Sequence, residues 1–181
     1  MNRFLVFLCC LIIAVVSFAQ NSEQHLKYMG VPITGTITQF QSKIAAKGVQ
    51  YDKFASSSIA SGTRAFNGTF AGNKVLIFVY YDTQSKVVYR VKSVINSVSE
   101  DIAEQKYANM RQLFMQKYND IQYDEQGGKE ALTIDTGNGR IDMYVCKDES
   151  ALRYPYNFSV HIDYWDGDNS DQHDNSLLED I

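Results

Sequence analysis

The stretch Asn73-Lys-Val-Leu-Ile-Phe-Val-Tyr-Tyr-Asp82 is a nearly continuous run of β-branched and aromatic residues. Such a run predicts a strand at the centre of a sheet or covered on both faces, because it leaves no polar side for water. Alternating segments flank it at residues 64–71 and 87–92, the second after a Thr-Gln-Ser turn at 83–85. These three segments predict a meander of antiparallel strands.

A helix is predicted on each side of this meander. The first should span about residues 37–47, where Thr36 and Gln39 form a capping box. Gly48 then suits a left-handed C-terminal cap. The second helix should run from Ser99 to about residue 118, because the Ser99 hydroxyl can cap it. Its expected buried stripe is Ile102, Ala103, Tyr107, Met110, Leu113, Phe114 and Tyr118.

Beyond the second helix, the chain repeats the order of elements found in its first half. A short extended piece and three strands are predicted at residues 121–123, 131–135, 140–147 and 156–164. The Gly137-Asn138-Gly139 turn is a strong hairpin signal. Residues 36–97 and 98–165 therefore each form a predicted α-β-β-β unit. We expect an α+β fold of tandem units, with antiparallel sheets, two helices packed on one face and the other face open to solvent.

The N-terminal residues have the organisation of a secretory signal peptide. Arg3 supplies a positive charge, residues 4–16 form an unbroken apolar run of thirteen, and residues 17–19 end in a small residue. Because a membrane span needs about 20 apolar residues, we expect cleavage after residue 19 rather than a permanent anchor. The mature protein is then periplasmic or secreted, with no membrane span, and begins with an extended lead-in at residues 20–35.

Composition limits the remaining possibilities. The mature chain of 162 residues keeps one cysteine, Cys146, so no internal disulfide can hold the fold. Residues 20–162 hold sixteen basic and fourteen acidic side chains, which is not the basic surface that nucleic acid requires. From Asp163 onward there are seven acidic residues and no Lys or Arg, so residues 166–181 are predicted to be a solvated acidic tail.

Alternation in the last two predicted strands turns polar and aromatic side chains to one face. Tyr, Trp and Arg are enriched at binding hot spots, so we predict a non-enzymatic module that binds a protein, a peptide or a glycan there. The candidate residues are Arg140, Asp142, Tyr144, His161, Asp163 and Trp165. The alternative interpretation is an ordinary solvated face that carries β-favouring tyrosines.

Two further functions stay open. His161 and Asp163 share a face, and a carboxylate can hold an imidazole in one tautomer, as a hydrolase would need. No nucleophile, phosphate or zinc motif accompanies them. Alternatively, the protein is an envelope structural protein, and its acidic tail docks on a partner. Its segment 166–171 is similar to a calcium loop, but Asp171 replaces the required Gly and Leu177 the required Glu. No metal or cofactor is therefore predicted.

The order of elements resembles that of a known group. The predicted arrangement has one helix on three or four antiparallel strands, and it occurs twice after a signal peptide. It resembles the small periplasmic modules of the PepSY and β-lactamase-inhibitor-protein-like group. The lead-in His25-Leu-Lys-Tyr-Met-Gly-Val-Pro-Ile-Thr-Gly-Thr36, with Phe66, Gly68, Phe70 and Gly72, is similar to exported proteins of anaerobic gut bacteria. The likeness covers most of residues 25–164. It implies binding or inhibition of another protein through an open sheet face, and carries over no contact residue.

Overall fold

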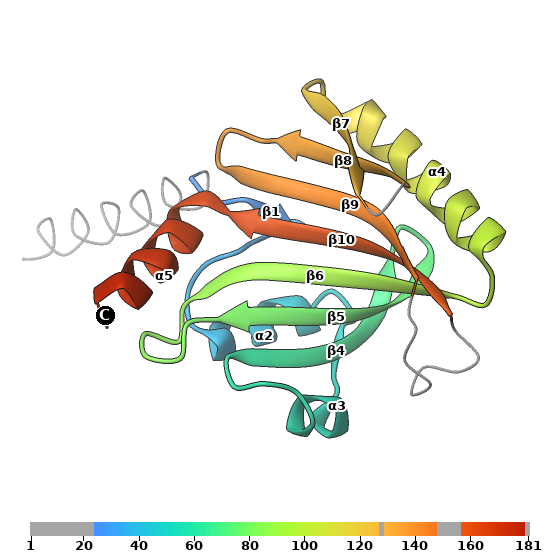
Figure 1. The fold of residues 1–181 in the computed structure, drawn as a ribbon. Coiled ribbons are helices and arrows are strands. Elements are labelled where there is room, and N and C mark those ends of the chain that lie inside the picture. Colours follow the sequence, from blue (N-terminus) through green and yellow to red (C-terminus); the bar gives the residue numbers. More distant parts are fainter. Residues whose placement is uncertain (1–23, 127–128, 148–156, 180–181) are drawn as a thin grey trace, which may run out of the picture.

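A computed structural model describes residues 24–126, 129–147 and 157–179, so the predicted signal peptide lies outside the described residues. The strands of the first half are β3 (Gln50–Tyr51), β4 (Thr63–Phe70), β5 (Asn73–Tyr81) and β6 (Val88–Ser97). Those of the second half are β7 (Ile121–Gln126), β8 (Lys129–Asp135), β9 (Gly139–Lys147) and β10 (Phe158–Asp166). They form one antiparallel sheet in the order β3-β4-β5-β6-β10-β9-β8-β7 (Figure 1). The fold is α+β, as predicted.

The two halves meet where β6 pairs with β10 in the middle of the sheet. Outward from that pair, each half contributes its remaining strands in reverse chain order, which is the arrangement expected of tandem units. Each half of the chain contributes four strands, because the short strands β3 and β7 also join the sheet. Residues 53–57 form the short helix α3 (Lys53–Ser57), since Asp52 Oδ1 accepts a hydrogen bond from the Ala55 amide at 2.9 Å.

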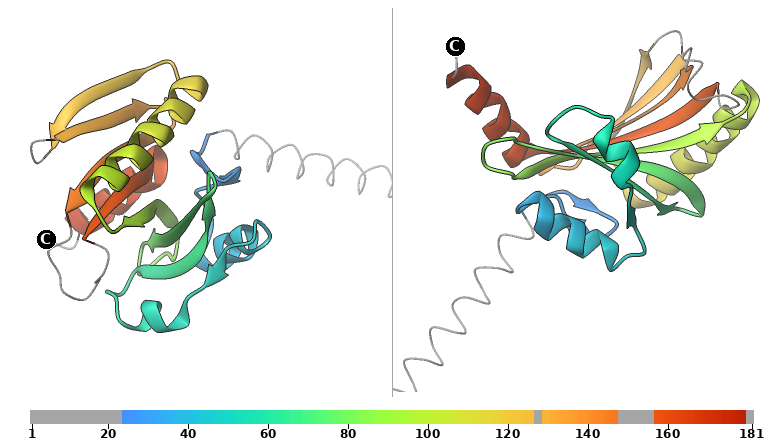
Figure 2. Two further views of the ribbon diagram at one scale, coloured as in Figure 1. Left: turned by 90° about the vertical axis from the view of Figure 1, so that its right-hand side faces the viewer. Right: turned by 90° about the horizontal axis from the view of Figure 1, so that it is seen from below.

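The helices α2 (Ile37–Ala45) and α4 (Glu100–Lys117) pack on one face of the sheet, and Thr36 with Gln39 forms the predicted capping box. Figure 2 (right) shows α2 on one side of the strands seen edge-on. The helix residues of the core are Ile37, Phe40, Ile44, Ala103, Tyr107, Met110 and Phe114. Two residues of the predicted stripe, Ile102 and Leu113, are instead exposed, because the helix buries a narrower face than the sequence pattern predicted.

The lead-in contributes to the same core. It forms a small hairpin of β1 (Lys27–Tyr28) and β2 (Val31–Pro32). Tyr28 is fully buried, and its hydroxyl lies 2.7 Å from Ser93 Oγ on the sheet. Its ring stacks on Phe70 and meets the edge of Tyr164, at centroid distances of 5.6 and 5.3 Å. The predicted extended segment is therefore a third element that covers the sheet beside the two helices.

Residues 167–179, part of the predicted acidic tail, form the helix α5 (Gly167–Glu179). Asp166 caps this helix by accepting a hydrogen bond from the Asn169 amide at 3.1 Å. Buried Asn169 then donates to the carbonyls of Ile33 and Val88 at 2.8 and 3.0 Å. These contacts attach the start of α5 to the body of the protein, whereas the acidic side chains at 168, 171 and 174 stay exposed. Among the described helices, none is long and apolar enough to cross a membrane.

The Asp166 carboxylate also ties the lead-in to the end of β10. It is fully buried and accepts hydrogen bonds from His25 Nδ1 at 3.0 Å and the Leu26 amide at 2.9 Å. Burial raises the pKa of Asp166 above its ordinary value, although the donors from His25, Leu26 and Asn169 oppose this shift. One buried carboxylate therefore connects the two ends of the described chain.

Nuclear magnetic resonance titration of the Asp166 carboxyl should give a midpoint above 3.8 in the folded protein. Because this pKa is raised on folding, the contribution of Asp166 to the free energy of unfolding is largest below the unfolded pKa and is lost as pH rises through the folded pKa. The His25→Ala variant should raise the midpoint further, since it removes a hydrogen bond to the charged form. A midpoint at or below 3.8 in the native protein would contradict the assigned cause.

Replacing Phe114 or Ile162 by Ala should lower the free energy of unfolding by about 2 to 5 kcal/mol, because both side chains are buried in the core. Trp165→Ala is the matched control, since this large side chain lies on the opposite face of β10 and is only half-buried. Its loss of stability, measured by chemical denaturation, should be clearly smaller. Equal losses in all three variants would contradict the assigned strand register.

Candidate binding face

All six predicted site residues lie on the sheet face opposite the helices α2 and α4. They extend from β9 and β10, as alternation along these strands predicted. The strand register adds side chains from β5 and β6 and arranges the whole face in three rows. The rows are Tyr80, Arg90, Trp165 and Arg140; Phe78, Lys92, Asp163 and Asp142; and Leu76, Val94, His161 and Tyr144.

Arg90 is held between two aromatic rings in the first row. Its guanidinium carbon lies 4.5 Å from the centroid of the Tyr80 ring and 3.9 Å from that of Trp165. Both distances are within the range of cation–π attraction. Arg140 approaches Trp165 at 5.8 Å. This row therefore presents two cations and two aromatic rings in alternation.

Asp163 belongs to the second row, but its neighbours cover it and it is only 3% exposed. Arg90 Nη2 and Lys92 Nζ approach its carboxylate at 2.8 and 3.4 Å. The Tyr144 hydroxyl donates to the same carboxylate at 3.5 Å. Asp163 was predicted to contact a ligand, but these neighbours cover it. Its role in this arrangement is to position the side chains above it.

Lys92 stays protonated in this setting. Burial lowers the pKa of its ammonium, but the Asp163 carboxylate and a hydrogen bond to the Tyr144 hydroxyl at 3.1 Å outweigh that effect and raise the pKa overall. Because Asp163 balances one of the two positive charges of Arg90 and Lys92, the upper surface of this cluster keeps a cationic character.

Asp142 and Arg140 form a more exposed pair at the edge of the face. Arg140 Nε donates to Asp142 Oδ2 at 3.0 Å, and their side chains are 56% and 21% exposed. Thr133 on β8 donates to the other carboxylate oxygen at 3.0 Å. This pair is accessible to a ligand, unlike Asp163.

His161 lies between hydroxyl groups. Its Nδ1 atom is 3.3 Å from the Tyr144 hydroxyl and its Nε2 atom is 2.9 Å from Ser159 Oγ. Ser159 is buried, so its hydroxyl is not open to a substrate. His161 and Asp163 share a face, as the sequence predicted, but they do not pair with each other. Both imidazole nitrogens of His161 lie against hydroxyl groups, and the Asp163 carboxylate lies against two cations.

A hollow of about 320 Å³ lies beside His161, where the chain after α3 passes over the sheet. Its apolar lining consists of Ile59 and Ala60 from this chain segment and of Phe78 and Val94 from the sheet. Lys92 reaches its edge. The hollow gives the face an apolar recess next to its charged cluster. Within the described ranges, no group of three or more His, Cys, Asp and Glu side chains could hold a metal ion.

Sequence reasoning missed Tyr80, Arg90 and Lys92, the side chains that complete the face. The alternation of β6 could have indicated that Arg90 and Lys92 share a face, but no local signal pairs β6 with β10. Comparison of the chain with protein-family models, curated proteins and solved structures found no match. The resemblance to the PepSY and β-lactamase-inhibitor-protein-like group therefore stays a prediction.

Asp163→Ala should lower the free energy of unfolding by about 3 to 5 kcal/mol, because it leaves two partly buried cations without their counter-charge. Asp142→Ala is the matched control and should cost less than about 1 kcal/mol, since its ion pair is solvent-exposed. Chemical denaturation at neutral pH measures both. Similar losses for the two variants would contradict a structural role that is specific to Asp163.

Proposed function

We propose that this protein is an exported, non-enzymatic binding module that docks a protein or peptide on its open sheet face. The observation that carries this proposal is Arg90, which Tyr80 and Trp165 hold between their rings and buried Asp163 anchors from below. Arg, Tyr and Trp dominate binding hot spots. Because these side chains are already fixed, a ligand would not have to order them at a cost in entropy.

The proposed partner surface carries carboxylates and apolar or aromatic side chains. Arg90 and Lys92 supply positive charge on this face, because Asp163 is covered. The charge of Arg140, in contrast, is balanced by Asp142. The recess beside Phe78 and Val94 can accept an apolar side chain. A broad face with one small recess suits a protein surface or an extended peptide better than a small substrate.

Export rests on the N-terminal residues. A positive residue, an apolar run of thirteen and a small residue before position 20 support cleavage of a leader and a periplasmic or secreted product. The PepSY-like resemblance points to the same compartment and to an open sheet face. Both arguments come from the sequence alone.

The alternative functions have less support. A hydrolase would need His161 to activate a nucleophile, yet its two ring nitrogens lie against Tyr144 and a buried serine. The exposed carboxylates of α5 still support the second alternative, in which the protein docks on a partner through its acidic C-terminal segment. A test of that function should neutralise those carboxylates rather than delete the segment, because deletion would also remove Asp166 and Asn169.

The proposal is tested by immobilising the mature protein, residues 20–181, and recovering partners from envelope and culture-supernatant extracts of the organism that makes it. A partner should be retained by the native protein and lost by the Tyr144→Ala/Trp165→Ala double variant. Tyr123→Ala is the matched control, since this exposed tyrosine lies beside Arg111 of α4 and away from the face. It should retain the partner.

Treatment of the extract identifies the class of partner. Binding that survives deglycosylation and disappears on proteolysis supports a protein or peptide. Binding that disappears on deglycosylation assigns the face to a glycan instead. If the double variant retains whatever the native protein retains, the open face is ordinary surface and the proposal is wrong.

A further inference from the structure

The sheet splits at one end, between β5 and β6. The ladder that joins these strands stops at the pair Leu76↔Val94, although β5 begins at Asn73 and β6 continues to Ser97. Lys74 and Asn96, the next hydrogen-bonding positions along the two strands, stay outside the ladder. The gap is part of a cavity of about 600 Å³, which lies within the size range of small-molecule sites.

Strand geometry directs backbone groups into this gap. The two-residue turn between Phe70 and Asn73 makes these residues a hydrogen-bonded pair, so the backbone of Asn73 faces β4. The alternation of an antiparallel ladder then turns the backbone N–H and C=O of Lys74 away from β4, toward β6. By the same rule, the backbone of Asn96 faces β5, since Val94 pairs with Leu76.

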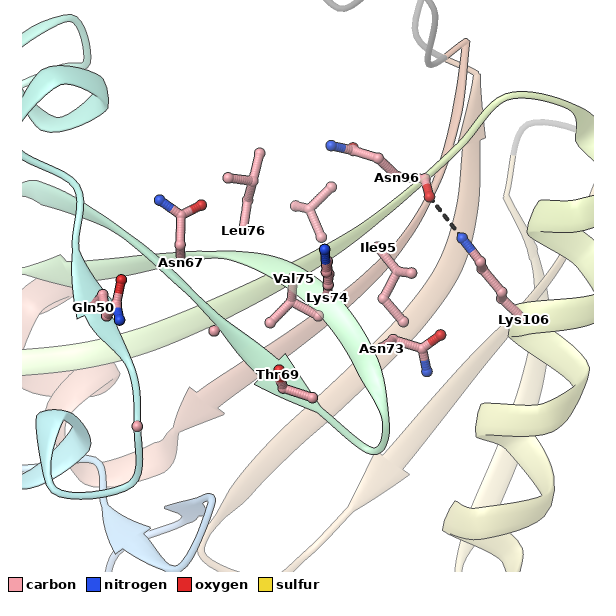
Figure 3. A pocket seen from close by; sticks show the side chains of 13 residues that line it. Gln50, Asn67, Thr69, Asn73, Lys74, Val75, Leu76, Ile95, Asn96 and Lys106 are labelled. Atoms are coloured by element: carbon pink, nitrogen blue, oxygen red, sulfur yellow. Dashed lines mark hydrogen bonds between the residues drawn. The ribbon is translucent and has the colours of Figure 1, made fainter.

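Lys106 of α4 takes the place of the missing ladder bond. Its Nζ atom donates to the Asn96 carbonyl at 2.7 Å, an acceptor that the Lys74 amide would occupy if the ladder continued (Figure 3). Burial lowers the pKa of the Lys106 ammonium. Within the described part of the chain, neither Lys106 nor Lys74 forms an ion pair. The cavity therefore contains two ammonium groups and two backbone N–H groups outside the ladder.

The remaining polar lining consists of amides and one hydroxyl, and no Asp or Glu lines the cavity. The carboxylate of Asp52 accepts a hydrogen bond from the side-chain amide of Asn67 at 2.9 Å, but Asp52 does not line the cavity. Asn96 Oδ1 is buried and has no hydrogen-bond partner among the described residues. This atom is closed to solvent, so it is not an acceptor for a ligand. Asn67 and Asn73 also line the cavity. Because their side-chain nitrogens donate to Asp52 and to the Ala71 carbonyl, their side-chain oxygens are the acceptors available to a ligand hydroxyl.

We propose that the cavity between β5 and β6 is a binding site for a hydroxylated carboxylate of the size of an acidic sugar. Lys74 and Lys106 bind the carboxylate as charge-assisted donors. The backbone N–H groups of Lys74 and Asn96 add donors that bind either carboxylate or hydroxyl oxygens. The side-chain oxygens of Asn67 and Asn73 accept hydrogen bonds from ligand hydroxyls. This site is separate from the cationic and aromatic cluster of the open face and does not depend on the function proposed for it.

The test titrates the mature protein with D-galacturonate and with D-galactose, which differ at the carboxylate carbon. Backbone amide resonances of Lys74 and Asn96 should shift on addition of galacturonate, and the affinity measured by calorimetry should be at least about tenfold higher than for galactose. Lys74→Met and Lys106→Met should each weaken galacturonate binding by about tenfold or more.

Two controls keep the result specific. Lys43→Met removes an exposed charge from α2, outside the cavity lining, and should leave the affinity unchanged. The Tyr144→Ala/Trp165→Ala variant should also bind galacturonate normally, which separates this site from the open face. Lys106→Met also removes the bond to Asn96, so its melting temperature is compared with that of the native protein. Lys74 is exposed, so its variant tests the site even if Lys106→Met is unstable.

The proposal is overturned if galacturonate causes no shift, or if galactose binds equally well. Loss of affinity in Lys43→Met equal to that in Lys74→Met would also overturn it, since the effect would then be one of overall charge.

Discussion

The antiparallel pairing of β6 with β10 is the constraint on which the rest of the structure depends. Without it, each half of the chain would expose a long strand edge, which proteins avoid. The pairing places Ile162 opposite Ser93 and Asp163 opposite Lys92. A slip of one residue would turn Asp163 toward the core and Ile162 toward water. The same register that builds the core therefore decides the composition of the open face.

Burial of Asp163 follows from that pairing. A carboxylate on β10 can leave water only because β6 brings two cations beside it and β9 brings the Tyr144 hydroxyl. In return, Asp163 holds Arg90 at the height where Tyr80 and Trp165 enclose it. The cations of the face are thus connected through one buried anion, and the aromatic rings enclose one of them.

Local signals in the sequence predicted much of the fold. The capping box at Thr36, the turn at residues 137–139 and the alternation of β9 and β10 each act over a few residues, and the structure contains all three. Local signals failed where distant groups compete. The acidic C-terminal segment was predicted to be solvated by its charge, yet Asn169 forms hydrogen bonds with the carbonyls of Ile33 and Val88 and attaches a helix there.

The sequence by itself determined the α+β class, the tandem order of elements and the six candidate side chains on the outward face of β9 and β10, because side-chain alternation has a period of two residues. Only the tertiary structure decided that Arg90, 73 residues before Asp163, would cover it and complete the face. It also decided that β5 and β6 separate at Lys74 and Asn96. Strand pairing depends on packing across the whole sheet, and no local pattern encodes which strands meet or where their pairing ends.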